Sequence, residues 1–213
     1  MARRVVITGL GAVTPLGVGV SALWDGLLHA RSGVKPITRF DASNFNCKLG
    51  GEVAGFSAKD SVPKHYRKAV KVMARDIELA VGAAKEAAED AKLTTRGTLP
   101  EDSTDPTTHP SARMGCHIGA GLISAESDEL TAAFSTAAGT GGGGVDLEAW
   151  GRTGMENLTP LWMLKYLPNM LACHVTIIHG CEGPSNTITC AEASGLLSIG
   201  ESTRVIKRGA AEL

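Results

Sequence analysis

Three short strand-like runs constrain the fold of this chain most strongly. They occupy residues 5–11, 114–121 and 185–191, and the first two end in glycine-rich turns. Short runs of this kind, bounded by turn residues, are typical of strands buried in a sheet. Helical stretches separate them along the chain. Alternating strands and helices predict an α/β fold with a mostly parallel sheet flanked by helices.

The clearest helical pattern lies between the first two strand-like runs. From residue 64 to about residue 92, apolar side chains recur at helical spacing, and Pro63 occupies the first-turn position. Ser21 is a candidate N-cap for an earlier helix that runs to Leu28. Further helices are predicted over residues 125–138, around 169–172 and over 195–206.

The remaining segments lack a core-forming pattern. Residues 31–62 carry scattered glycine and proline and predict loops with a short hairpin. Residues 93–112 are rich in Thr, Pro, Ser and Asp and predict a solvated surface loop, and the glycine run at 138–144 predicts a flexible break. The sequence ends after a helix, where α/β alternation expects a further strand, so we expect the printed chain to stop within its fold.

Composition and charge exclude several classes of function. The 213 residues are 43% hydrophobic, which provides for the core of one domain or one large half-domain. A net charge of −1 without any basic run argues against a nucleic-acid partner. No apolar run approaches the roughly 20 residues that span a bilayer, so we expect a cytoplasmic protein.

The sequence also predicts that the protein uses neither a metal nor another cofactor. The five cysteines form no C-x-x-C pair, and the histidines and cysteines lack zinc-ligand spacing. The stretch GLGAVTPLG at 9–17 lacks the spacing of a dinucleotide-binding turn, because Thr14 stands where the third glycine would be. We interpret it as a turn that ends a strand.

The order of motifs along the chain resembles the β-ketoacyl-acyl-carrier-protein synthases, an acyltransferase family of fatty-acid and polyketide biosynthesis. The motifs are RVVITGLGAVTPLG at 4–17, RSGV at 31–34, FD at 40–41, GEV at 51–53, NMLACH at 169–174, GPS at 183–185 and ASG at 193–195. The resemblance implies the N-terminal half of a ketosynthase II-like, thiolase-like layered fold. Residues 1–213 would form the N-terminal domain, without the C-terminal half that carries the family's catalytic histidines and lysine.

The family's nucleophilic cysteine lies three residues before the glycine of a C-[ST]-[SA]-G motif, at the start of a buried helix. Counting back from Gly195 reaches Glu192, and counting forward from the GPS motif reaches Glu192 again. Cys190 is two residues too early and matches a strand position. The resemblance therefore implies that Glu192 replaces the nucleophile, while Ala193, Ser194 and Gly195 shape the oxyanion site at the helix end.

A glutamate has no route to the usual acyl-enzyme, because the thiolate is the group that accepts the acyl chain. The leading hypothesis is a partner of an active synthase that resembles chain-length-factor subunits. One alternative is a malonyl-carrier-protein decarboxylase, or an active synthase in which Cys190 or a C-terminal half supplies the chemistry. The other is a fragment without a function of its own.

The resemblance also implies binding partners and candidate substrate contacts. Partners would be an acyl carrier protein and a second synthase subunit, in a homodimer or heterodimer formed near residues 187–191. Trp162, Met163, Asn169 and Met170 are candidates for an acyl tunnel, with plain core packing as the alternative. An acidic carrier could dock on Arg67, Lys68 and Lys71, although a solvated helix face is the default interpretation of these side chains. His174 is expected to be a buried structural residue, as are His117 and His179.

Overall fold

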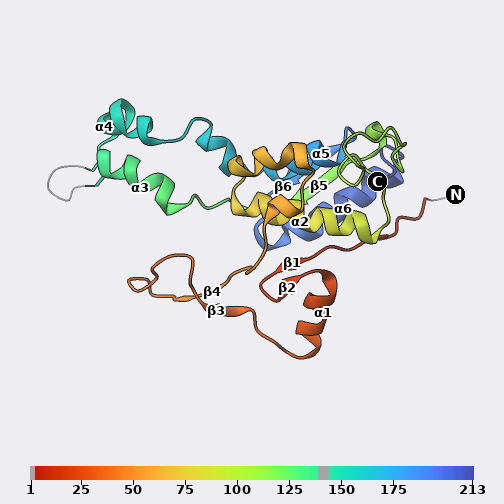
Figure 1. Ribbon diagram of the computed structural model, residues 1–213, viewed down its shortest axis with the longest axis horizontal. Coiled ribbons are helices and arrows are strands. Elements are labelled where there is room, and N and C mark those ends of the chain that lie inside the picture. The colour runs from red at the N-terminus through yellow and green to blue at the C-terminus, as the bar shows by residue number, and fades with distance from the viewer. Residues whose placement is uncertain (1–2, 139–143) are drawn as a thin grey trace.

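The computed structural model describes residues 3–138 and 144–213, so most of the predicted glycine-rich break lies outside the described residues. Figure 1 shows a central body in which α2, α5 and α6 surround the strand pair β5 and β6. An arm that contains α3 and α4 projects from one end of this body. A separate lobe below the central body contains α1 and the strands β1 to β4.

The centre of the body is a parallel pair of strands. β5 (Cys116–Gly119) and β6 (Ser185–Ile188) run in register from Cys116 opposite Ser185 to Gly119 opposite Ile188. α6 (Ser194–Lys207) and α5 (Met170–His179) both contact this pair. The predicted second and third strands and the helix over residues 195–206 are therefore confirmed, with shorter strands.

The first predicted strand is wrong as a sheet element, because residues 3–12 make no strand pairing in the described structure. The segment instead lies extended along α2 (Arg75–Asp90). A Cβ at Gly9 would lie 2.3 Å from the carbonyl oxygen of Ala87, so glycine is what permits this close approach. Without a neighbouring strand, Val6 and Ile7 remain 66% and 74% exposed.

The lobe is built from two small antiparallel pairs and one helix. β1 (Val13–Thr14) pairs with β2 (Gly17–Val18), and β3 (Val34–Pro36) pairs with β4 (Leu49–Gly51), which confirms the predicted short hairpin. α1 (Val20–Leu28) begins after Gly19. The prediction of Ser21 as N-cap is wrong, because the φ of +97° at Gly19 turns the chain into the helix two residues earlier.

The long helix predicted from residue 64 to about 92 is broken in two. η2 (Lys64–Val72) is a 3-10 helix that follows Pro63, and α2 begins only at Arg75. Between them Met73 and Ala74 have extended backbones, with ψ angles of 135° and 163°. Both side chains are buried, so the break itself belongs to the core.

The rest of the chain forms short helices and connections. They are η1 (Ala58–Asp60), η3 (Ser111–Arg113), α3 (Ser127–Thr136), α4 (Leu147–Ala149), the π-helical η4 (Trp150–Gly154), η5 (Met155–Asn157), η6 (Trp162–Tyr166) and η7 (Ala191–Ala193). α3 confirms the helix predicted over residues 125–138. Residues 93–110 contain turns but no helix or strand.

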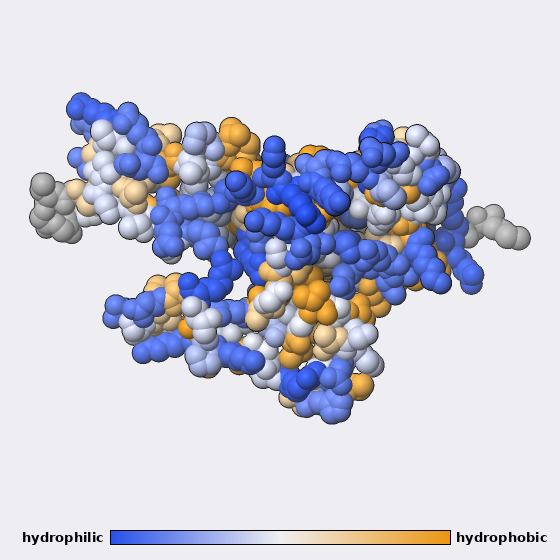
Figure 2. All heavy atoms as spheres, viewed as in Figure 1, coloured by the Kyte–Doolittle hydropathy of each residue, from blue (hydrophilic) through white to orange (hydrophobic). Residues whose placement is uncertain are grey.

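The core of the body joins α2 and α5 to the segment after β5. Its fully buried members include Ile77 and Val81 of α2, with Val175 and Ile178 of α5 packed against them. Figure 2 shows apolar residues that also reach the surface of the body and the lobe. Leu196 and Ile199 of α6 are 76% and 56% exposed. No helix within residues 3–138 and 144–213 is long and apolar enough to cross a membrane.

Candidate functional site

The candidate site is the turn between β6 and α6, where Glu192 is located. β6 ends at Ile188, and a single 3-10 turn (Ala191–Ala193) precedes the first residue of α6, Ser194. Ala191 has a φ of +43°, a left-handed conformation that is uncommon for alanine. This conformation reverses the chain sharply and presents Glu192 at the amino end of α6, exposed to solvent.

The side chain of Ser194 stabilises this turn through two hydrogen bonds to the backbone. Its side chain is buried, and its Oγ accepts a hydrogen bond from the backbone N–H of Cys190 at 2.8 Å. The same hydroxyl donates to the carbonyl oxygen of Ala191 at 2.6 Å. A buried hydroxyl that satisfies two backbone groups holds a strained turn in one conformation. Ser194 therefore holds the turn in place by bonding to its backbone.

The backbone at the end of β5 packs closely against the backbone at the start of α6. A Cβ at Gly119 would lie 2.4 Å from the backbone nitrogen of Gly195 and 2.4 Å from the carbonyl carbon of Ser194. Only glycine permits backbones to approach so closely. Gly195 itself has open space where its Cβ would be. Gly119 is therefore the glycine that positions the helix end beside the sheet.

The chemistry available at this turn is that of a carboxyl group at a helix amino end. The first N–H groups of a helix and its dipole favour negative charge there by about 0.3–1 kcal/mol at exposed positions. Within the described residues no hydrogen bond or ion pair reaches the Glu192 carboxylate. Cys190 is exposed and follows the end of β6, so its prediction as a strand residue is wrong because the ladder stops at Ile188.

The four tunnel candidates occupy different environments. Trp162 and Met170 pack against the buried core, and the Trp162 and Tyr166 rings lie 5.1 Å apart. Met163 is 63% exposed. Asn169 is exposed and lines a pocket of about 210 Å³ with Cys173 and Thr187, among others, and Glu192 is not among its lining residues. Core packing thus explains two of the four side chains.

Two of the three histidines expected to be structural, His174 and His179, are held by neighbouring hydroxyl groups, whereas His117 is only partly buried. His174 Nδ1 lies 2.9 Å from the Tyr66 hydroxyl, and His179 Nδ1 lies 2.8 Å from Thr95 Oγ1. Burial lowers the pKa of both imidazoles, as it does that of His117. The buried, hydrogen-bonded role is confirmed for His174. Thr95 was missed, because it is a buried residue within a polar segment predicted to be a solvated loop.

The described part of the chain contains no group of three or more His, Cys, Asp or Glu side chains arranged to hold a metal ion.

Comparison with known proteins identifies the family. The family model for the β-ketoacyl synthase N-terminal domain matches residues 2–213. The chain belongs to the β-ketoacyl synthase family. The 3-oxoacyl-acyl-carrier-protein synthase 2 of Synechocystis sp. is 32% identical over 212 residues, which are 99% of this chain and 44% of that protein. The protein of the same name from Staphylococcus aureus is 30% identical over 210 residues, with the same coverage.

Solved structures of β-ketoacyl synthases share the fold. The ishigamide ketosynthase/chain length factor matches with a TM-score of 0.73 and 26% identity, over 99% of this chain and 46% of that chain. A β-ketoacyl synthase from Burkholderia phymatum matches with a TM-score of 0.70 and 25% identity, over 99% and 45%. The thiolase-like α/β fold is thereby confirmed. This β-ketoacyl synthase domain spans about half the length of the relatives that it matches.

Proposed function

We propose that this chain is a ketosynthase-like subunit that does not form an acyl-enzyme and acts as a chain-length-factor-like partner of an active synthase. The observation that carries the proposal is the position of Glu192, which lies three residues before Gly195 at the amino end of α6. This is where the family motif places its cysteine. The resemblance to a structure described as a ketosynthase/chain length factor supports this reading.

The chemistry of the side chain supports the loss of acylation. Thioester exchange needs a thiolate, which attacks the acyl carbonyl and releases the carrier thiol. A carboxylate that attacked instead would form an anhydride, which is a far more reactive species than the thioester it replaced. The same helix end that would stabilise a thiolate stabilises the Glu192 carboxylate, so the turn keeps its shape without the acylation step.

Two surfaces support the proposed partners. The curated relatives are named for an acyl carrier protein, and Arg67, Lys68 and Lys71 are exposed on η2, where an acidic carrier would find complementary charge. β6 pairs with β5 along one edge and has no other strand partner among residues 3–138 and 144–213. An open strand edge suits pairing with a second synthase subunit.

Acylation of the full-length protein by a radiolabelled acyl-acyl-carrier-protein tests the proposal. We expect no covalent label on the wild type, and label on the Glu192→Cys variant, because the turn around residue 192 keeps its geometry. Cys190→Ala is the matched control and should behave as the wild type. Label on wild-type protein that disappears in Cys190→Ala would overturn the proposal and assign the acyl transfer to Cys190.

The alternative decarboxylase activity has a separate readout. Release of labelled carbon dioxide from malonyl-acyl-carrier-protein by the same full-length protein would support it. If release persists in Glu192→Ala, Glu192 does not carry that activity. If the full-length wild type releases no labelled carbon dioxide, the decarboxylase hypothesis is rejected.

A further inference from the structure

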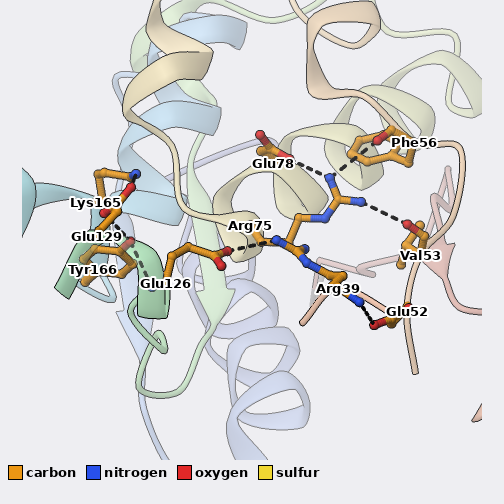
Figure 3. A network of polar contacts seen from close by, with 10 residues as sticks. All are labelled: Arg39, Glu52, Val53, Phe56, Arg75, Glu78, Glu126, Glu129, Lys165 and Tyr166. Carbon is orange, nitrogen blue, oxygen red and sulfur yellow. Dashed lines mark hydrogen bonds and ion pairs between the residues drawn. The ribbon is translucent and has the colours of Figure 1, made fainter. Parts of the chain in front are cut away.

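One side of β5 has no neighbouring strand within residues 3–138 and 144–213, because β5 pairs only with β6. The charged side chains of the body are matched more completely. In the network of Figure 3, Arg75 donates to Glu78 at 2.6 Å and Arg39 donates to Glu126 at 3.0 Å. Unpaired backbone groups inside a layered body are costly, so the open side of β5 is the part of the body that most needs a partner.

The direction of the backbone groups of β5 follows from its bonds to β6. Ala120, which directly follows β5, donates its N–H to the carbonyl oxygen of Ile188 in β6 at 3.1 Å. Successive residues of a strand direct their N–H and C=O groups to alternate sides, so even-numbered residues bond toward β6. The odd-numbered residues of β5, His117 and Gly119, therefore direct their N–H and C=O groups to the open side.

Leu213 already occupies the first position on that side. Its carbonyl oxygen accepts from the N–H of Gly115 at 2.8 Å, and its own N–H donates to the carbonyl of Arg113 at 3.3 Å. One residue that bonds to two residues flanking its neighbour is the pattern of a parallel ladder. Figure 1 shows this end of the chain within the central body. A chain that continued in the same direction would pass His117 and then Gly119.

The surroundings of the open side are apolar. A pocket of about 340 Å³ borders it, lined by alanines of α2, by Val175 of α5 and by Leu213, among others. Helices cover both faces of β5, because Ile118 packs against the core of α2 and α5 whereas Gly119 faces the start of α6. A strand beside β5 would thus be covered on both faces, and strands of that kind are nearly continuous apolar runs.

We propose that the open side of β5 binds a short apolar strand, parallel to β5, formed by the residues that follow Leu213 in the full-length protein. Leu213 is already paired in the required direction, whereas a strand from a second copy would have to displace it. This chain spans 44% of its Synechocystis relative, so a protein of that length supplies the strand from its own polypeptide. The proposal is independent of the acylation chemistry at Glu192.

Hydrogen–deuterium exchange of the full-length protein, read at single amides, tests the proposal. We expect the amides of His117 and Gly119 to exchange at least roughly a hundredfold more slowly than in an unfolded peptide. The amide of Ala120, which bonds to β6, is the internal reference and should be protected to a similar degree. Protection should persist on roughly hundredfold dilution, because a strand from the same polypeptide does not depend on protein concentration.

Three results would overturn the proposal. Fast exchange at His117 and Gly119 beside a slow Ala120 would show that the open side of β5 faces solvent. Protection that disappears on dilution would assign the strand to a second copy. Charged residues within the first four or so positions after Leu213 in the full-length sequence would exclude a strand covered on both faces.

Discussion

Ser194 Oγ accepts a hydrogen bond from the backbone N–H of Cys190 at 2.8 Å, across the turn that contains Glu192. The bond joins the first residue of α6 to Cys190, two residues after the end of β6, and the turn that it closes contains the left-handed Ala191. The end of the strand, the exposed carboxylate and the start of the helix are therefore joined in one turn. The shape of the candidate site depends on this serine.

Removal of the hydroxyl should loosen the turn measurably. Ser194→Ala leaves the Cys190 N–H and the Ala191 carbonyl without their partner, and we expect a loss of about 1–2 kcal/mol in the free energy of unfolding. Urea denaturation measures this loss. Ser198→Ala is the matched control, because the buried Ser198 donates only to the carbonyl of Gly195 within the same helix. That change should be nearly neutral, and equal losses in both variants would contradict the role assigned to Ser194.

The contact between β5 and α6 gives a second prediction. Gly119→Ala inserts a Cβ within 2.4 Å of two backbone atoms of α6, so the helix start must move, and we expect destabilisation of at least about 1–3 kcal/mol. Gly195→Ala is the control. Its new Cβ meets open space in a helix, and we expect it to be neutral or to stabilise by about 0.5–1 kcal/mol. A Gly119→Ala variant as stable as Gly195→Ala would show that the two backbones do not pack so closely.

The thiols provide a third prediction, on chemical reactivity. Burial, with smaller effects of the neighbouring thiols, raises the pKa of Cys116 to about 12, and burial raises that of Cys181 to about 11. Since the thiolate is the reactive form, both should be alkylated slowly at pH 8, whereas Cys47 and Cys190 are exposed. Peptide mapping after timed iodoacetamide treatment should find Cys116 and Cys181 labelled at least about tenfold more slowly than Cys190.

Denatured protein is the control for that experiment, because all five thiols should then react at similar rates. Labelling of Cys116 as fast as Cys190 in the folded protein would mean that β5 is accessible to solvent in solution.

Local patterns predicted β6, α6 and the position of Glu192 because each depends on neighbours in the sequence. The break at Met73 and Ala74 was not predictable in this way, since the apolar spacing of η2 continues into α2 without a breaking residue. Both side chains are nevertheless buried in the core. Residues 5–11 have strand-like composition, but strand pairing requires a partner that composition alone does not specify.

Polar contacts between segments that are distant in the sequence could not be predicted from it either. Glu129 and Lys165 are 36 residues apart and lie on separate elements, so no spacing rule links them. Thr95 belongs to a segment of solvated composition and is nevertheless buried against His179. In the candidate site, the motif predicted a site-shaping role for Ser194, but the bond of Ser194 to Cys190 depends on a turn conformation that only the structure provides.

The buried histidines make stability depend on pH. Burial holds the pKa of His174 and His179 below the usual 6.5, so below that pH the unfolded chain binds protons that the folded protein excludes. Stability should be full above about pH 6.5 and should fall as the pH is lowered from 7 to 5. Urea denaturation across this range should give a shallower slope in His174→Gln and His179→Gln, with His117 contributing part of the remainder. A wild type whose stability is constant across this range would contradict the burial of both imidazoles.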